Sequence, residues 1–202
     1  MKERSERYAK EWQMPGTIRS FIAFDIDSES ILKKITGIQN ILIKTGASLK
    51  LVKPENIHIT VRFLGNITPN MTEKIFEEMK KVQFAAFDVK IRGIGAFPHL
   101  RHPRVLWTGI TEGADQLRNI FNQLEPRLRG LGFAPDTRGF SPHLTIVRVK
   151  SGRNKAELVK CVTENANYEF GIVKAEWLRL KRSDLTPKGP IYSTLKEFCP
   201  PK

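Results

Sequence analysis

Two copies of one four-residue pattern constrain this sequence most strongly. The first copy spans His58 to Val61 (HITV) and the second spans His143 to Ile146 (HLTI), so two of the four histidines share one context. Side chains alternate between the two faces of a β-strand, and each histidine therefore shares a face with the threonine two positions later. The copies predict two strands that each present one imidazole and one hydroxyl on the same face.

The flanking residues decide which other side chains join these faces. The first copy extends into a predicted strand over residues 57–64, where alternation puts His58, Thr60 and Arg62 together, so Arg62 is expected to add a charge-assisted clamp on an anionic substrate. The second copy extends into a predicted strand over residues 143–149. There the same parity puts Arg148 on the face opposite His143, which makes Arg148 structural unless a bulge or the strand's end re-aims it.

The segments that precede the two copies match in kind. A strand near residues 21–24 and an amphipathic helix with apolar positions from Ile31 to Leu42 lead to the first copy, and a strand over 105–109 and a helix over 113–130 lead to the second. Such repetition is typical of a duplicated unit. We predict a bilobal, duplicated α+β fold in which two antiparallel sheets face each other across a central cleft, with helices on the outside. The two histidines would then lie on opposite sides of that cleft.

The other expected elements complete one bilobal domain. Residues 1–18 are expected to form a flexible N-terminal extension, and residues 19–202 one domain. Glycines and Pro98 predict an irregular stretch after a strand at 87–91, followed by a basic loop over residues 99–104. Further elements are a short strand at 49–52, helices over 68–81 and 154–163, and strands near 168–173, 175–181 and 192–198.

The charge of the chain indicates its partners. A net charge of +13 is spread along the sequence, which favours nucleic acid among possible ligands. No apolar stretch is long enough to span a bilayer, and the highly charged start predicts neither a signal peptide nor an anchor. Cys161 and Cys199 lack metal-type spacing and suit a reducing, cytoplasmic compartment, although a single disulfide between them stays open. A monomer is the default expectation.

Two histidines on one cleft can carry out acid–base chemistry on a phosphodiester. With an unperturbed pKa of about 6.5, one imidazole can deprotonate an attacking oxygen while the other protonates the leaving oxygen. The threonine hydroxyls can donate hydrogen bonds to phosphate oxygens. This chemistry requires no metal and no cofactor. A zinc or two-metal site is the rival interpretation, but no acidic or cysteine ligands recur beside the motifs.

Five stretches, two of which contain the motif copies, form a recognisable set, namely Phe21 to Asp25, Asn56 to Gly65, Gly95 to Pro98, Pro103 to Trp107 and Pro142 to Arg148. Together they resemble the RNA 2′,3′-cyclic phosphodiesterase branch of the 2H phosphoesterase superfamily, which is also described as LigT-like or as 2′-5′ RNA ligase. The resemblance covers residues from about 19 to 198.

This resemblance implies that the protein hydrolyses 2′,3′-cyclic phosphate ends of RNA to 2′-phosphates. It makes His58 the proton donor to the leaving 3′-oxygen, His143 the acceptor that activates water, and Thr60 and Thr145 the phosphate-binding hydroxyls. Arg148 matches a basic position that is usual after the second motif, which opposes the parity argument. Some members also join tRNA halves through a 2′-5′ linkage. A non-catalytic RNA-binding protein and a phosphodiesterase for a small cyclic nucleotide are the alternatives.

Overall fold

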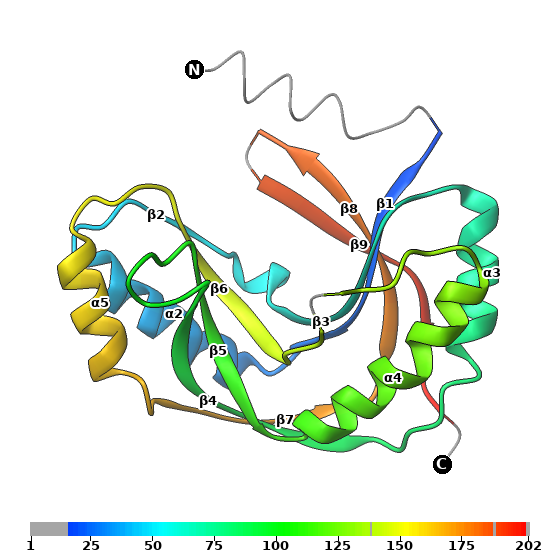
Figure 1. The fold of residues 1–202 in the computed structure, drawn as a ribbon. Coiled ribbons are helices and arrows are strands. Elements are labelled where there is room, and N and C mark those ends of the chain that lie inside the picture. The colour runs from blue at the N-terminus through cyan, green and yellow to red at the C-terminus, as the bar shows by residue number, and fades with distance from the viewer. Residues whose placement is uncertain (1–15, 138, 188, 201–202) are drawn as a thin grey trace.

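The computed structural model describes residues 16–137, 139–187 and 189–200 (Figure 1). Most of the expected flexible extension falls on residues 1–15, outside the described residues, so it stays a prediction. The expected helices and strands are all present, with ends that shift by a few residues. The strands are β1 (Ile18–Asp25), β2 (Leu49–Leu51), β3 (His58–Ile67), β4 (Phe87–Phe97), β5 (Val105–Glu112), β6 (His143–Val149), β7 (Glu169–Ala175), β8 (Leu178–Thr186) and β9 (Gly189–Phe198). The helices are α2 (Glu29–Ile43), α3 (Pro69–Met79), α4 (Ala114–Gly130) and α5 (Lys155–Glu164), with a 3-10 turn, η1 (Pro54–Asn56).

The strands form one sheet, and the prediction of two separate sheets is wrong. Eight of its nine strands run in the antiparallel order β7-β4-β5-β6-β3-β1-β8-β9, and the ninth, β2, pairs with β6 outside this path. The two motif strands, β3 and β6, are the central neighbours, and they pair at Ile59 and Leu144. Because this pairing falls at the start of both strands, the sheet is continuous at the motifs while its two halves diverge beyond them (Figure 1).

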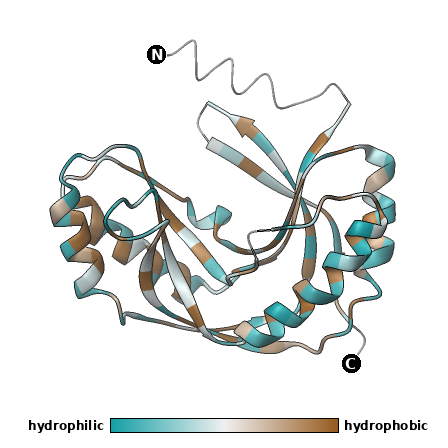
Figure 2. Cartoon of the chain, in the orientation of Figure 1, coloured by the Kyte–Doolittle hydropathy of each residue, from teal (hydrophilic) through white to brown (hydrophobic). Residues whose placement is uncertain are grey.

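Each half of the sheet carries two helices on its outer side. In the α3–α4 lobe, α3 and α4 contact strands β9 and β3, and in the α2–α5 lobe, α2 and α5 contact strands β7, β6 and β4. The helix α2 follows β1 of the α3–α4 lobe but packs in the other lobe, so the chain crosses between the two (Figure 1). Apolar residues of α2 and α5 gather on the sides that face the sheet (Figure 2). Together with the buried residues of the strands and of the other helices, they form one continuous hydrophobic core.

The strand β4 continues through the stretch that was expected to be irregular. Gly93 has a positive φ of 80° at an irregularity in the pairing with β5, and the ladder resumes at Ile94. At Gly95 a Cβ atom would collide with the ring of Trp107. These glycines therefore accommodate a bulge and a close ring contact inside a strand. A local sequence pattern cannot distinguish such glycines from those of a turn.

Two remaining expectations concern the thiols and membranes. Cys161 and Cys199 are both free in the structure, with Cys161 buried and Cys199 partly exposed. Among the helices of the described residues, none has the length and apolar character needed to cross a bilayer.

Candidate active site

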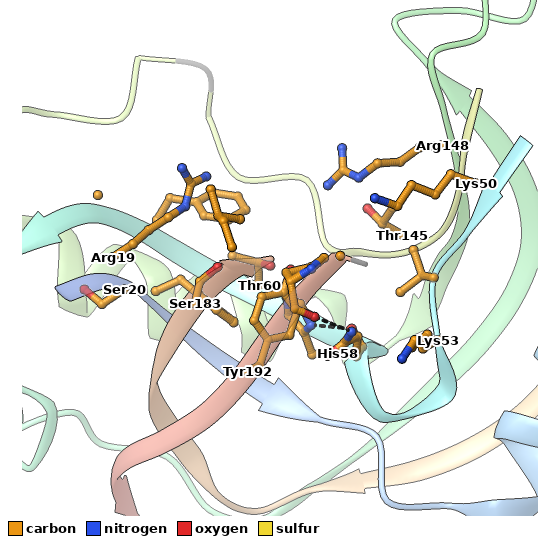
Figure 3. Close-up of a pocket in the computed structure, with 18 of the residues that line it drawn as sticks. Arg19, Ser20, Lys50, Lys53, His58, Thr60, Thr145, Arg148, Ser183 and Tyr192 are labelled. Carbon is orange, nitrogen blue, oxygen red and sulfur yellow. Dashed lines mark hydrogen bonds between the residues drawn. The ribbon is translucent and has the colours of Figure 1, made fainter. Parts of the chain in front are cut away.

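Both motif copies line one pocket between the two lobes (Figure 3). The pocket has a volume of about 770 Å³ and includes His58 and Thr60 of β3 together with His143 and Thr145 of β6. The pairing of β3 with β6 brings residues 85 positions apart in the sequence to one place. The residues predicted from the two patterns therefore meet as expected.

The two imidazoles are held in the same way. Nδ1 of His58 lies 2.8 Å from the carbonyl oxygen of Asn56, and Nδ1 of His143 lies 2.7 Å from that of Ser141. A carbonyl oxygen only accepts hydrogen bonds, so Nδ1 must carry the hydrogen in both rings. In each neutral ring Nε2 is then the nitrogen with a free lone pair, available to accept a proton or, once protonated, to donate one.

Burial among aromatic rings lowers the pKa of both histidines. The ring of His58 lies 4.8 Å from that of Phe21 and 5.2 Å from that of Tyr192, between ring centroids. The ring of His143 lies 4.9 Å from that of Phe97. Desolvation disfavours the charged imidazolium, which lowers the pKa of His58 to about 4 and also lowers that of His143.

Charged neighbours distinguish the two histidines. Asp25 pairs with His58 across β1 and β3, and its carboxylate forms an ion pair with Lys181. The Asp25 charge raises the pKa of His58, whereas the charges of Lys181 and of His143 lower it. For His143 the causes are burial and, in the opposite direction, the hydrogen bond to Ser141. The motifs thus match in sequence pattern and in ring geometry, but among the described residues an ion pair lies only beside His58.

Arg62 departs from the predicted position. Its side chain is 8% exposed, and it does not line the pocket. Its Nε lies 2.8 Å from Oε2 of Glu125 in α4, and the guanidinium also contacts Asp136 and the carbonyl oxygen of Ala134. Strand parity fails because Ala23 pairs with Thr60 whereas Ile22 pairs with Arg62, which leaves Val61 as an extra residue. The bulge turns Arg62 toward α4 and puts Phe63 in the pocket instead.

A matching bulge turns Arg148 into the pocket. Trp107 pairs with Thr145 and Leu106 with Val147, so Ile146 is the extra residue in β6. Arg148 consequently lines the same pocket as Thr145, and Figure 3 shows it beside Lys50, its partner across β2 and β6. This bulge is the exception under which strand alternation would not make Arg148 structural. The position found agrees with the basic position of the family pattern.

Other pocket residues were not singled out from the sequence. Arg19, Lys50 and Lys53 give the pocket three more cations besides Arg148, and no Asp or Glu among the described residues lines it. Tyr192 contributes a ring next to His58 (Figure 3). Nothing in the sequence marks these residues, because strands distant along the chain bring them to the site. A concave, cationic, partly aromatic lining is suited to an anionic ligand.

Within the part of the chain that the structure describes, no group of three or more His, Cys, Asp or Glu side chains could hold a metal ion. The pocket's titratable groups are imidazoles, cations and the Tyr192 phenol, whose pKa is raised by burial. The chemistry that these residues themselves offer is proton transfer and anion binding.

Sequence comparisons give related proteins along nearly the whole chain. The model of the LigT like Phosphoesterase family matches residues 26–107 and 109–192. The chain is 40% identical to an RNA 2′,3′-cyclic phosphodiesterase of Aeropyrum pernix over 164 residues, which cover 81% of this chain and 93% of that protein. It is 37% identical to the RNA 2′,3′-cyclic phosphodiesterase of Archaeoglobus fulgidus over 187 residues, which cover 90% and 99% of the two chains.

Solved structures share the fold. Escherichia coli LigT complexed with 3′-AMP superposes with a TM-score of 0.76 at 20% identity, over 92% of this chain and 99% of that chain. A protein of Thermus thermophilus superposes with a TM-score of 0.74 at 24% identity, over 90% and 97% of the two chains.

Proposed function

Because this chain belongs to the LigT-like phosphoesterase family, we propose that it is a metal-independent RNA 2′,3′-cyclic phosphodiesterase that leaves the phosphate on the 2′-oxygen. The observation that carries the proposal is the pair of imidazoles on one cationic pocket, each with Nδ1 bonded to a carbonyl and Nε2 free to transfer a proton. The names of the relatives in Aeropyrum pernix and Archaeoglobus fulgidus support the substrate class.

The proposed reaction uses the two rings in opposite roles. Nε2 of His143 takes a proton from water while the water oxygen attacks phosphorus, and the bond between phosphorus and the 3′-oxygen breaks. Nε2 of His58 gives its proton to that 3′-oxygen, so the products are a 3′-hydroxyl and a 2′-phosphate. Each transfer has a histidine positioned for it, and general acid–base catalysis of this kind contributes about 10²- to 10⁴-fold.

The remaining pocket groups bind the charge that develops on phosphate. The hydroxyls of Thr60 and Thr145 come from the same strand faces as the imidazoles and can donate to the two non-bridging oxygens. The guanidinium of Arg148 adds charge-assisted hydrogen bonds from the α2–α5 lobe. Arg62, buried against Glu125, has no part in this proposal.

The rate is expected to depend on pH in a specific way. The pKa values of both histidines are lowered in the free protein, so both rings are mainly neutral near pH 7, whereas the reaction needs one imidazolium and one neutral imidazole. We expect a bell-shaped kcat/KM profile whose alkaline decline begins below the ordinary histidine pKa of about 6.5, because the pKa values of both rings are lowered. A bound phosphodiester anion favours the imidazolium, so the alkaline decline of kcat should occur at higher pH than that of kcat/KM. Steady-state rates across this range measure both profiles. A flat kcat/KM profile would contradict the acid–base assignment, and coincident alkaline declines of kcat and kcat/KM would contradict the effect of the bound phosphodiester.

The same site can support RNA joining, in which a hydroxyl replaces water as the attacking group. A ribose 2′-hydroxyl carries the phosphate, and a 5′-hydroxyl end can replace water at the phosphorus of the cyclic end, which would give the 2′-5′ linkage with the roles of the two histidines unchanged. RNA halves such as those of a cleaved tRNA are substrates of the required kind. Detection of a joined product whose linkage resists a 3′-5′-specific nuclease would support this second activity.

One assay tests the proposed function directly. Chelator-treated protein is incubated with an RNA oligonucleotide that ends in a 2′,3′-cyclic phosphate, and with the corresponding cyclic mononucleotide. We expect the oligonucleotide to be opened to a 2′-phosphate. A 3′-phosphate product, or loss of activity with chelator, would overturn the mechanism. Binding without turnover would favour an RNA-binding protein, and a preference for the mononucleotide would favour a small-molecule phosphodiesterase.

A further inference from the structure

A second hollow lies in the α2–α5 lobe, beyond the end of β6. It has a volume of about 490 Å³, and its cationic side chains come from three segments, namely the loop before β5, the end of β6 and the start of α5. We call this hollow the distal groove and define it by His102, Arg104, Lys150 and Lys155. No Asp or Glu of the described chain lines it.

The cations of the distal groove lack acidic partners. Arg104, Lys150 and Lys155 are exposed, and among the described residues none of them forms an ion pair. Several cations elsewhere on the surface do, for example Lys33 with Glu29, Lys80 with Glu77 and Lys90 with Glu112. Three unpaired cations around one hollow repel each other, and an anionic ligand would relieve this repulsion.

The distal groove continues the line of cations that begins in the pocket. Arg148 lines the pocket and Lys150, two residues later, lines the groove, which corresponds to about 7 Å along a strand. The backbone N–H of Val149 donates to the carbonyl oxygen of Arg104 at 2.9 Å, which fixes the loop before β5 against β6. Figure 1 shows β6 running from the junction of the lobes toward α5. Pocket and groove are thus successive positions along one strand.

A substrate with a reactive 3′ end must direct the rest of its chain out of the pocket. Among the described residues, the lining on the α3–α4 side includes Phe63, Leu185 and a single cation, Arg19. On the α2–α5 side it includes Lys50 and Arg148, followed by the distal groove. Backbone phosphates dominate the affinity of nucleic acids for proteins, and they favour the path with more cations.

We propose that the distal groove binds the phosphodiester backbone of the RNA on the 5′ side of the cyclic phosphate, so that the RNA chain leaves the active site across the α2–α5 lobe. The proposal rests on the proposed function for the location of the reactive end. It assigns Arg104, Lys150 and Lys155 to binding of longer RNA and gives them no part in bond cleavage.

Substrate length provides the test. The triple variant Arg104→Glu, Lys150→Glu, Lys155→Glu is compared with the wild type on a cyclic-phosphate dinucleotide and on a 20-nucleotide RNA with the same end. We expect KM for the long RNA to rise at least about tenfold, and the slope of log KM against log salt to fall by about 2, as for three lost contacts to single-stranded RNA. For the dinucleotide, kcat and KM should change much less than for the long RNA, because its one internucleotide phosphate can reach at most the nearest of the three cations.

The matched control reverses the charge of three exposed cationic side chains outside the groove. The triple variant Lys74→Glu, Arg129→Glu, Lys174→Glu makes the same change in net charge on α3, α4 and β7. An equal effect of both triple variants on long RNA, or no effect of the groove variant, would overturn the proposal. If the charge reversal prevents folding, glutamine replaces glutamate at the same positions, with the same expectation in direction.

A binding measurement separates this proposal from the proposed function. Fluorescence anisotropy with a 20-nucleotide RNA that ends in a 3′-hydroxyl reports binding without turnover. Weaker binding by the groove variant alone supports the groove even if no cyclic phosphate is hydrolysed. Conversely, if the groove variant hydrolyses the dinucleotide and binds long RNA as the wild type does, the proposed function stands and the RNA-binding role of the groove is overturned.

Discussion

Replacing either pocket histidine with alanine is expected to lower kcat on a cyclic-phosphate dinucleotide by about 10²- to 10⁴-fold. His58→Ala removes the proton donor and His143→Ala removes the acceptor. Because both act in one concerted transfer, the double variant should lose much less than the product of the two single effects. Single-turnover rates at saturating enzyme measure the chemical step. Additive losses would indicate that the two rings act independently.

Asparagine provides the structural control for this experiment. The side-chain amide of His58→Asn can still donate to the carbonyl oxygen of Asn56, which replaces the Nδ1 bond, but it has no group that titrates at the position of Nε2. We expect the asparagine variants to be as inactive as the alanine variants and to unfold at nearly the wild-type temperature. His99→Ala, in an exposed loop, should retain wild-type kcat. Activity in the asparagine variants would overturn the acid–base roles.

Arg62→Ala is expected to have the largest effect on stability. The guanidinium is buried against Glu125 and Asp136, whose side chains are 16% and 12% exposed. Its removal takes this cation away from the partly buried carboxylate of Glu125, and breaking a buried pair in this way costs about 3–5 kcal/mol. We expect the free energy of unfolding, measured by urea denaturation, to fall by that amount. At temperatures where the variant remains folded, KM should stay within about twofold of the wild type.

Arg148→Ala is the matched control, because the sequence places the two arginines at similar distances after their motifs. Arg148 is exposed in the pocket, so its removal should change the free energy of unfolding by less than about 0.5 kcal/mol. It should instead raise KM, through the loss of a charge-assisted bond to phosphate of about 1.5–3 kcal/mol. The reverse outcome, with Arg62→Ala impairing KM and Arg148→Ala impairing stability, would restore the parity prediction.

Local patterns predicted most elements of the fold. Apolar spacing from Ile31 to Leu42 predicted α2, which buries that face, and Thr68 followed by Pro69 predicted the start of α3, where the threonine hydroxyl accepts a bond from the N–H of Met71. The stretch from Gly93 to Phe97 was missed as a strand. Its glycines accommodate a bulge and the ring of Trp107, and such contacts depend on a neighbouring strand that no local pattern describes.

The separation into two sheets was wrong for a similar reason. Two repeated units can form two sheets or share one, and the difference here is a single pairing between Ile59 and Leu144. Strand pairing depends on which edges meet in space, because every strand carries the same backbone donors and acceptors. The sequence pattern therefore predicts the strands of both lobes without specifying how the lobes join.

By itself, the sequence determined that two strands each present a histidine and a threonine on one face, because alternation over two positions is a property of the extended backbone. The tertiary structure decided which arginine accompanies them. A one-residue bulge in β3 buries Arg62 against α4, and a matching bulge in β6 directs Arg148 into the pocket. Each extra residue reverses the parity of all that follow it, and bulges arise from the pairing of neighbouring strands, which only the folded chain brings together.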